Sequence, residues 1–381
     1  MTFIPFNKPG LAGDELKNIE QAIANAHLSG NGPFTKKCQR WIEQRLASPR
    51  ALLTHSCTAA LEMAALLSGA GSGDEVIMPS FTFVSTANAF VLRGATPVFV
   101  DIRPDTLNLD ESLVEQAITP RTRAIVPVHY AGVGCEMDEI GRIAARHGLL
   151  VIEDAAQGVM AAYKGRPLGS MGDASALSFH ETKNVIAGEG GALVVNRSEW
   201  FDRAEILWEK GTNRTLFSRG KIDKYSWIDV GSSYLPSEIN AAFLWAQLEH
   251  AEAITDRRRA IWAEYHRRLA PLESLGVVRR PIVPDHCTAN AHMYYLLVAD
   301  AHLRPGLIAT LDKHGINAVS HYAPLHSAPA GRRFGRTAGA LDVTESVGER
   351  LVRLPLWPAM VPDEVTAVID AVTAWAGAAW R

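Results

Sequence analysis

Lys183 and Asp154 are the two residues of this sequence whose types and positions point most directly to chemistry. Lys183 follows the apolar run 174–179 and precedes the glycine turn 188–191. A lysine held at the end of a strand can be desolvated enough to become nucleophilic. Asp154 ends a second apolar run, residues 149–153, and so presents a carboxylate where a buried parallel strand leaves its sheet.

A lysine that forms a Schiff base and an acid that pairs with a pyridinium nitrogen are the groups that pyridoxal phosphate (PLP) chemistry requires. Each residue alone has an ordinary alternative. A lysine near a strand end is usually a solvated surface charge, and an aspartate there can cap the next helix. The occurrence of Lys183 and Asp154 together, at the ends of two strands, favours a PLP site.

Two further segments have a place in such a site. Residues 54–60 follow a predicted strand and open a helix, so their hydroxyl and free N–H groups could hold a phosphate. An ordinary Ser/Thr N-cap explains the same residues. Phe83 lies at the next strand-to-helix junction, where its ring could stack on a flat cofactor, although an isolated Phe there is more often part of the core. The 188–191 turn lacks the spacing of a nucleotide-binding loop.

Several other polar residues are weaker candidates. His321 and His326 flank a Tyr-x-Pro turn, and a lone histidine in such a place is usually structural. No HExxH or similar grouping predicts a metal site. Arg214 could clamp a diphosphate or a carboxylate with two hydrogen bonds, and its ordinary alternative is a surface arginine.

Strand-like and helix-like segments alternate up to about residue 195. This βα alternation predicts an α/β fold with a largely parallel sheet and helices on both faces. Helices are expected over residues 58–67 and 137–147, the second ending in basic residues before a glycine. The strands are expected at residues 51–54, 75–78, 97–101, 124–128, 149–153, 174–179 and 192–195.

The rest of the chain predicts a smaller α/β unit. A polar and aromatic stretch, residues 210–233, precedes a strongly helical segment at 236–272. A chain of 381 residues is longer than one hydrophobic core usually supports, so we expect a large domain over residues 1–250 and a small C-terminal domain over 251–381. Its predicted strands are residues 293–299 and 318–322, and its helices residues 306–314 and 362–376.

Composition narrows the class of protein. The chain has 38 Lys and Arg against 41 Asp and Glu, so no field of one sign indicates nucleic acid or an anionic membrane as a partner. The four cysteines show no paired or metal-ligand spacing, which favours free thiols in a reducing compartment. With neither a secretion signal nor a long apolar stretch, a cytoplasmic protein outside the membrane is expected.

The segments around the two key residues also carry a family resemblance. The run Ser178-Phe179-His180-x-Thr182-Lys183-Asn184, the turn 188–191 and Glu153-Asp154-Ala155-Ala156-Gln157 resemble the signature of the DegT/DnrJ/StrS family of sugar-nucleotide aminotransferases. The resemblance extends over the chain through residues 81–94, 125–132, 153–160, 209–214 and 321–326. It implies the aspartate-aminotransferase-like fold of PLP-dependent enzymes (fold type I) and a homodimer with active sites shared between subunits.

The resemblance also implies roles for single residues. Lys183 would be the Schiff-base lysine, Asp154 the partner of the pyridine nitrogen, and Gln157 the partner of the phenolic oxygen. Phe83 would pack on the cofactor ring.

Phosphate contacts follow in the same way. Ser178 and the backbone of Thr58 and Ala59 would bind the cofactor phosphate. Relatives carry an Asn in a Gly-Tyr-Asn-Tyr-Arg segment that reaches the neighbouring subunit's phosphate; this chain has Ser233 in Gly-Ser-Ser-Tyr-Leu, a shorter donor. The predicted substrate contacts are Arg214, His321, Tyr322 and His326.

A specific reaction follows from the same likeness. It points to members that transfer an amino group from L-glutamate to C4 of dTDP-4-dehydro-6-deoxy-D-glucose, giving dTDP-4-amino-4,6-dideoxy-D-galactose, a sugar of enterobacterial common antigen. The alternatives are an equatorial 4-amine or a 3-amine. A related dehydratase would carry His in place of Lys183, and a non-catalytic regulatory protein would not need Lys183, Asp154, Gln157 and Ser178 together.

Overall fold

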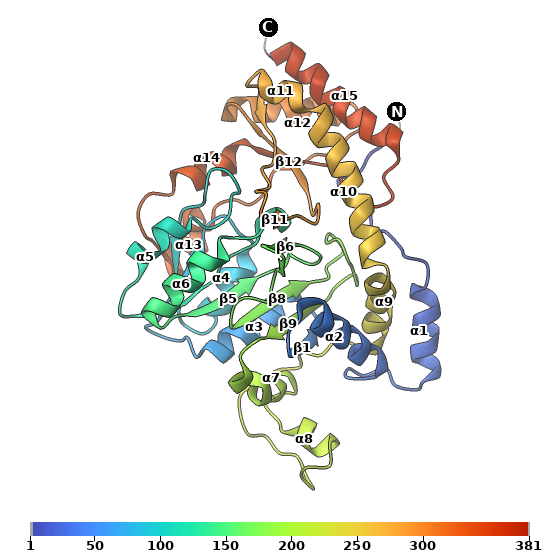
Figure 1. The fold of residues 1–381 in the computed structure, drawn as a ribbon, viewed down its shortest axis with the longest axis vertical. Helices are drawn as coiled ribbons and strands as arrows, with labels where there is room; N and C mark the ends of the chain where they lie inside the picture. Colours follow the sequence, from blue (N-terminus) through green and yellow to red (C-terminus); the bar gives the residue numbers. More distant parts are fainter. Residues whose placement is uncertain (1–2, 380–381) are drawn as a thin grey trace.

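The computed structural model describes residues 3–379, and its centre is an eight-stranded sheet (Figure 1). Six neighbouring strands pair in parallel, in the spatial order β8, β5, β4, β2, β3 and β13, whereas β9 is antiparallel to its two neighbours, β1 and β8. The largely parallel sheet expected from the sequence is therefore confirmed. In spatial order the strands are β1 (Arg50–Thr54), β9 (Gly191–Val195), β8 (Ala174–Ser178), β5 (Leu150–Asp154), β4 (Thr122–Ile125), β2 (Glu75–Pro79), β3 (Thr96–Val100) and β13 (Arg336–Thr337).

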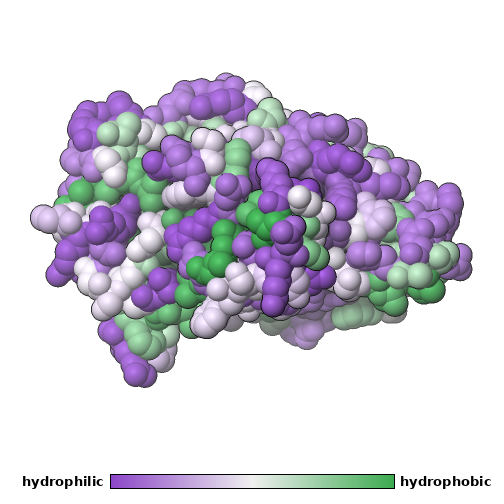
Figure 2. Space-filling view, turned by 90° about the horizontal axis from the view of Figure 1, so that it is seen from below, coloured by the Kyte–Doolittle hydropathy of each residue, from purple (hydrophilic) through white to green (hydrophobic). Residues whose placement is uncertain are grey.

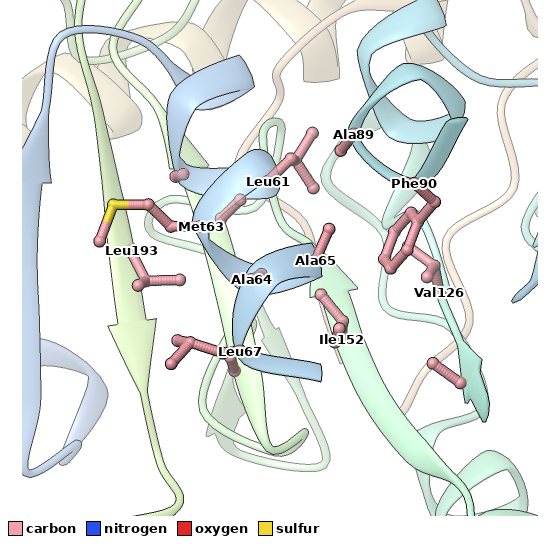
Figure 3. Packing of buried hydrophobic residues seen from close by; sticks show 14 of the residues in the cluster. Leu61, Met63, Ala64, Ala65, Leu67, Ala89, Phe90, Val126, Ile152 and Leu193 are labelled. Atoms are coloured by element: carbon pink, nitrogen blue, oxygen red, sulfur yellow. The ribbon is translucent and has the colours of Figure 1, made fainter. Parts of the chain in front are cut away.

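Helices cover both faces of this sheet because the strands are apolar on both sides. On one face lie α3 (Cys57–Ser68), α4 (Val84–Val91) and α7 (Phe201–Trp208), packed on alternate strand residues. Figure 3 shows side chains of α3 and α4 meeting Val126, Ile152 and Leu193. The opposite face is covered by α2 (Pro33–Leu46), α5 (Val114–Ala117), α6 (Met137–His147) and α9 (Glu238–Glu249).

The predicted elements of the first half are all present, with small shifts of their ends. The α3 helix begins after Ser56, whose Oγ accepts from Ala59 N at 3.1 Å, and it ends at Gly69 with φ 72°. The predicted helix 137–147 matches α6 at both ends. One strand differs, because β4 ends at Ile125 rather than at residue 128. Pro127 follows, and proline has no N–H to extend the ladder.

A second, antiparallel sheet lies in the C-terminal part of the chain. It consists of β10 (Val278–Arg279), β12 (Tyr294–Val298) and β14 (Leu351–Leu354). Its core includes side chains from α10 (Ala251–Arg268), α12 (Arg304–Lys313) and α15 (Pro362–Ala379), together with Ile4. Figure 1 shows α10 leading from α9, beside the large sheet, to this second sheet. The boundary between residues 250 and 251 stays a prediction.

Two predictions for this half are wrong in detail. The helical segment 236–272 is broken at His250, whose φ of −108° and ψ of 11° leave the helical region, and it forms α9, α10 and α11 (Ala270–Ser274). Residues 318–322 form no strand but a single bridge between Val319 and Arg353. The extended run stops because Tyr322 adopts the left-handed region, with φ 34°.

The segment after α7 leaves the body of the molecule. It contains α8 (Arg214–Ser218), which lies at one end in Figure 1 and on the face shown in Figure 2, where apolar side chains gather among polar ones. Within residues 3–379, no helix has the length and apolar character needed to cross a membrane. The remaining elements are α1 (Glu15–Ala24), α13 (Pro329–Phe334), α14 (Asp342–Arg350) and a small sheet of β11 (Cys287–Thr288), β6 (Ala162–Tyr163) and β7 (Arg166–Pro167).

Glu75 joins the outer strands of the large sheet. This buried carboxylate at the start of β2 accepts from Arg336 Nε at 2.9 Å and Arg336 Nη2 at 2.7 Å, and also from Thr119 Oγ1 at 2.8 Å. Arg121 pairs with the same carboxylate. Chiefly through the hydrogen bonds from Arg336, the pKa of Glu75 is lowered to about 2. The pair ties β13, from the C-terminal part, to the large sheet.

We expect Glu75→Gln to lower the free energy of unfolding at pH 7 by about 2–4 kcal/mol, because it leaves Arg336 without its charged partner. A carboxyl group with a lowered pKa stabilises the fold above its unfolded value and loses this effect as pH falls toward about 2. Urea unfolding from pH 7 to pH 3 should thus show a smaller loss in the variant. Glu115→Gln, which removes a surface ion pair with Arg146, should cost less than about 1 kcal/mol; equal effects would contradict the assignment.

Candidate active site

A cavity of about 730 Å³ lies at the carboxyl ends of the central strands. Its wall includes residues at the ends of β5 and β8, residues that follow β1 and β2, and residues of β14 in the second sheet. Ligands of open α/β sheets bind at this edge, and the volume is typical of a small-molecule site.

Lys183 lies in the loop between β8 and β9. The loop is held by hydrogen bonds of 2.9 Å from Phe179 N to Gly190 O and 2.8 Å from Glu181 N to Gly188 O, while Lys183 N donates to His180 O at 2.8 Å. The side chain lines the cavity. Burial lowers the pKa of its amine, although the charge of Asp154 acts in the opposite direction. The amine therefore loses its proton more readily than a surface lysine.

Asp154 ends β5 with its carboxylate buried in the same cavity. Thr86 Oγ1 donates to Oδ2 at 2.6 Å, and Ala156 N donates to Oδ1 at 3.1 Å. Thr82 in turn bonds Thr86 at 2.8 Å, so two hydroxyls of the α4 region orient the acid. Sequence analysis did not predict a role for Thr86. Small polar residues at the start of a helix are common, so its type and position gave no reason to choose it.

Gln157 and Tyr322 lie beside Asp154. Gln157 Oε1 accepts from Ala131 N at 2.7 Å, and Nε2 donates to Tyr322 Oη at 3.0 Å. The second proton of Nε2 remains available to a ligand. Tyr322 holds a left-handed backbone, with φ 34°, that is costly for a bulky residue. Strain of this kind, enforced by surrounding contacts, is typical of functional sites.

His321 forms an aromatic wall with its neighbours. Its ring stacks on Tyr322 with a centroid distance of 3.6 Å, and Nδ1 is hydrogen-bonded to Tyr130 Oη at 2.9 Å. Burial, reinforced by the charges of Arg353 and Lys183, lowers the pKa of His321 well below its usual value, so the ring is neutral at pH 7. Tyr130, which the sequence did not indicate, fixes this ring in place.

The N-terminus of α3 and its surroundings supply hydroxyl groups. Thr58 Oγ1 lies 2.7 Å from Ser85 Oγ, and both residues line the cavity together with Ser178. The predicted phosphate contact of Ala59 stays a prediction. Its N–H donates to Ser56 Oγ, which caps the helix, and the residue does not line the cavity. Phe83 lies at the cavity with 56% of its surface exposed and its ring 6.4 Å from that of Tyr322.

Three predicted residues lie outside the cavity. His326 is engaged within the fold, with Nδ1 2.8 Å from Ser80 Oγ and Nε2 3.2 Å from Glu345. Arg214 and Ser233 are exposed on the segment that carries α8, where Arg214 lies over the Tyr225 ring at 6.0 Å. Neither lines the cavity of its own chain, and their contact with a second subunit stays a prediction.

Two arginines in the wall were not anticipated. Arg258 lies in α10 among three successive arginines, which gave no reason to choose one of them. Arg353 lies in β14, and an available signal was a charged residue inside the apolar run Leu351-Val352-Arg353-Leu354. His292, also in the wall, has its Nδ1 3.1 Å from Asn184 Oδ1.

The site fits PLP on the evidence of Asp154. Among residues 3–379, no Lys, Arg or His nitrogen lies at ion-pair distance from this buried carboxylate. A buried anion without a cation is costly, and a protonated pyridine ring would supply one. Lys183 offers the amine, and the hydroxyls near the α3 N-terminus suit a phosphate. No group of three His, Cys, Asp or Glu side chains in the described part of the chain is arranged for a metal ion.

The chain is similar to sugar aminotransferases over its whole length. It is 35% identical over 378 residues to the spore coat polysaccharide biosynthesis protein SpsC of Bacillus subtilis, covering 97% of this chain and 96% of SpsC. Its structure is similar to that of S. venezuelae DesV in complex with a ketimine intermediate, with 32% identity, 99% of each chain covered and a TM-score of 0.88. The PLP form of Spr1654 from Streptococcus pneumoniae gives a TM-score of 0.91 at 26% identity, again over 99% of each chain.

Residues 9–373 match the DegT/DnrJ/EryC1/StrS aminotransferase family. This match, with the parallel sheet and the cavity at its edge, confirms the fold type I α/β class and PLP as the cofactor. The chain belongs to the DegT/DnrJ/EryC1/StrS family of PLP-dependent sugar aminotransferases.

Proposed function

We propose that this aminotransferase moves an amino group from L-glutamate to C4 of dTDP-4-dehydro-6-deoxy-D-glucose and releases dTDP-4-amino-4,6-dideoxy-D-galactose. The observation that carries the catalytic part is the meeting of a desolvated Lys183 and a cation-free Asp154 in one cavity. The choice of sugar is supported by the likeness of segments 209–214 and 321–326 to enzymes of this specificity. In the structure, His321 and Tyr322 of the second segment line the cavity.

The roles of the chain's residues follow from their positions. Bound PLP supplies an electron sink for the bond that breaks at the substrate carbon. Asp154 holds the pyridine nitrogen protonated, because an opposite charge close by raises the pKa of that nitrogen. Lys183 Nζ would bind the cofactor and would be the group that moves the proton at the substrate carbon. With PLP bound, Gln157 Nε2 would donate to the phenolic oxygen, Phe83 would cover the ring, and the hydroxyls of Thr58 and Ser178 would contact the phosphate.

A homodimer with shared sites accounts for the exposed segment that carries α8. This segment presents an unusual number of exposed apolar side chains, with Trp227 80% exposed. The others are Phe217, Tyr225, Ile228 and Val230. A partner subunit would cover them, and Arg214 and Ser233 would then reach the partner's cavity. The proposal includes action on cytoplasmic sugar nucleotides in polysaccharide synthesis. The name of the relative SpsC, a spore coat polysaccharide biosynthesis protein, supports this part.

Two other reactions and one non-catalytic role compete with this proposal. Amination with equatorial geometry at C4, or at C3, would use the same cavity and the same Lys183. A regulatory protein without activity would have no use for a desolvated lysine beside a buried acid. Incubation with PLP, L-glutamate and a panel of keto-sugar nucleotides, followed by identification of the aminated product, separates these possibilities.

Replacement of Lys183 by Ala should abolish covalent attachment of the cofactor and lower turnover by about 1,000-fold or more, since the proton carrier is lost. Borohydride reduction followed by mass analysis of peptides measures the attachment, and circular dichroism reports on the fold. Lys164→Ala, at an exposed lysine paired with Asp138, is the matched control and should behave as wild type. Repeated turnover by the Lys183→Ala protein would refute the assignment.

Mixing Lys183→Ala with Arg214→Ala should restore activity if sites are shared. Each variant alone is expected to be weakly active. Random exchange of equal amounts makes half of the dimers mixed, and each mixed dimer contains one intact site. The mixture should therefore recover up to about a quarter of wild-type activity. Differently tagged subunits establish that exchange has occurred. With exchange shown, a mixture no more active than its components would mean that Arg214 does not complete the partner's site.

Proton NMR of the product tests the stereochemistry. The face that receives the proton depends on how the sugar ring is presented to Lys183, because this amine serves one side of the cofactor plane. An axial 4-amine leaves H4 equatorial, so a small H3–H4 coupling is expected. A large diaxial coupling, or nitrogen at C3, would contradict the proposed specificity while leaving the aminotransferase activity in place.

A further inference from the structure

A buried arginine holds the segment 289–292, which lies just before β12 and outside any strand. Arg258 of α10, 1% exposed, donates from Nε to Ala291 O at 3.1 Å and from Nη2 to His292 O at 2.7 Å. Ala291 has a left-handed backbone, with φ 53°, which is uncommon outside glycine. Buried carbonyl groups outside helices and strands need such partners, and a strained residue persists only where its surroundings fix it. Arg258 therefore determines the course of this segment.

The side chain of Asn290, inside this segment, joins it to the loop after β5. Asn290 Nδ2 donates to Gln157 O at 2.8 Å and to Val159 O at 2.7 Å. Asn290 Oδ1 accepts from His292 N at 3.0 Å, so both ends of the buried amide are engaged. The fit is close, because a side chain on Gly132 would overlap Asn290 Oδ1.

Asn290 contacts both groups that fix Gln157. It binds the backbone carbonyl of Gln157 directly. Gln157 Oε1 accepts from Ala131 N at 2.7 Å, and Ala131, with φ 57°, is followed by the Gly132 that packs against Asn290. A shift of Asn290 would thus move the backbone of Gln157 and the N–H that orients its amide. Displacements near 1 Å can lower an enzyme's rate about 100-fold.

The same segment holds the residue next to Lys183. Asn184 Nδ2 donates to Asn290 O at 2.7 Å, and Asn184 Oδ1 lies 3.1 Å from His292 Nδ1. Asn184 is buried and follows Lys183 directly in the chain, so these two contacts limit where Lys183 can lie. The segment 289–292 therefore contacts the loop of Lys183 as well as that of Gln157.

We infer that Arg258 and Asn290 are positioning residues of the active site. Arg258 fixes the segment 289–292, and Asn290 holds Gln157 and the loop of Lys183 against it. A helix that packs on the second sheet thereby places two residues that the large sheet brings to the cavity. The inference rests on the proposed contact of Gln157 with the phenolic oxygen of PLP and adds what places that side chain.

The visible absorption of bound PLP, measured without substrate, tests this placement. A donor on the phenolic oxygen lowers the pKa of the nitrogen through which Lys183 holds the cofactor, because it draws negative charge away from that nitrogen's proton. Gln157→Met should therefore raise the pH midpoint of the absorbance change by about one unit. Asn290→Leu, which keeps the branching without a charge, should raise it by about half a unit or more. The double variant should go no further than Gln157→Met, because Asn290 acts through Gln157.

Arg258→Lys separates position from charge. A lysine keeps the positive charge but lacks the planar fork that binds Ala291 O and His292 O together. We expect the pH midpoint to rise as in Asn290→Leu. The rate at which added PLP becomes attached to the apo-protein, measured by borohydride trapping, should fall about 10-fold, because Lys183 is less well placed.

Two matched variants control for a merely structural effect. Asn196 also bridges two carbonyl groups, those of Gly169 at 3.4 Å and Gly172 at 2.8 Å, but it does not line the cavity. Asn196→Leu should lower stability in urea as Asn290→Leu does and leave the pH midpoint unchanged. Arg350→Lys, at an arginine of α14 that donates to Val298 O at 2.7 Å, should also leave it unchanged. Asn290→Ala replaces Asn290→Leu if the latter does not fold.

The possible results separate the inference from the proposed function. A raised midpoint in Gln157→Met with none in folded Asn290→Leu and Arg258→Lys would overturn the inference. Full additivity in the double variant, or an equal rise in Asn196→Leu, would do the same, because the effect would then not act through Gln157. No rise in Gln157→Met would refute its proposed contact with the cofactor, and the inference with it. Rises as expected in a protein that aminates no keto sugar would support the inference and refute the proposed function.

Discussion

The site depends on a buried carboxylate, Asp154, for which the described part of the chain offers no cation. Two hydrogen bonds, from Thr86 and from Ala156 N, keep the carboxylate in place, but hydrogen bonds from neutral donors offset only part of the cost of burying a charge. The free energy that is left can be recovered only from a ligand that carries a positive charge at that point. The protonated pyridine nitrogen of PLP is a group that would supply this charge.

The second sheet and the helix α10 contribute positively charged side chains to the wall of the cavity. The large sheet brings Asp154, Ser178 and Lys183 to the cavity, whereas β14 and α10 bring Arg353 and Arg258, both without carboxylate partners in residues 3–379. A ligand that combines a cationic ring with anionic groups therefore complements the two halves of the wall. Neither sheet alone makes the site, because the wall of the cavity takes residues from both.

The sequence was sufficient for what depends on local pattern. Apolar runs bounded by turns predicted seven of the eight strands of the large sheet, β1 to β5, β8 and β9, and Asp154 lies at the end of β5 as expected. The short strands β6 and β7 were not predicted. The misses have nonlocal causes. Thr86, Tyr130, Arg258 and Arg353 acquire their surroundings from residues tens to hundreds of positions away, so no window of sequence contains the information. The N-cap bond from Ala59 N to Ser56 Oγ is local and is the ordinary alternative that the sequence also offered for this segment.

The failed strand at 318–322 shows why local propensity was overruled. An extended course would carry Tyr322 away from Gln157, whereas the observed left-handed turn at φ 34° brings its hydroxyl to Gln157 Nε2 and stacks His321 on its ring. Backbone strain of this type costs roughly 1–3 kcal/mol. The hydrogen bond and the contacts with Tyr130 and Phe81 offset it by holding both rings. Gln157 is thereby aimed before any ligand binds, and a polar group fixed in advance needs no reorganisation when charge moves in the reaction.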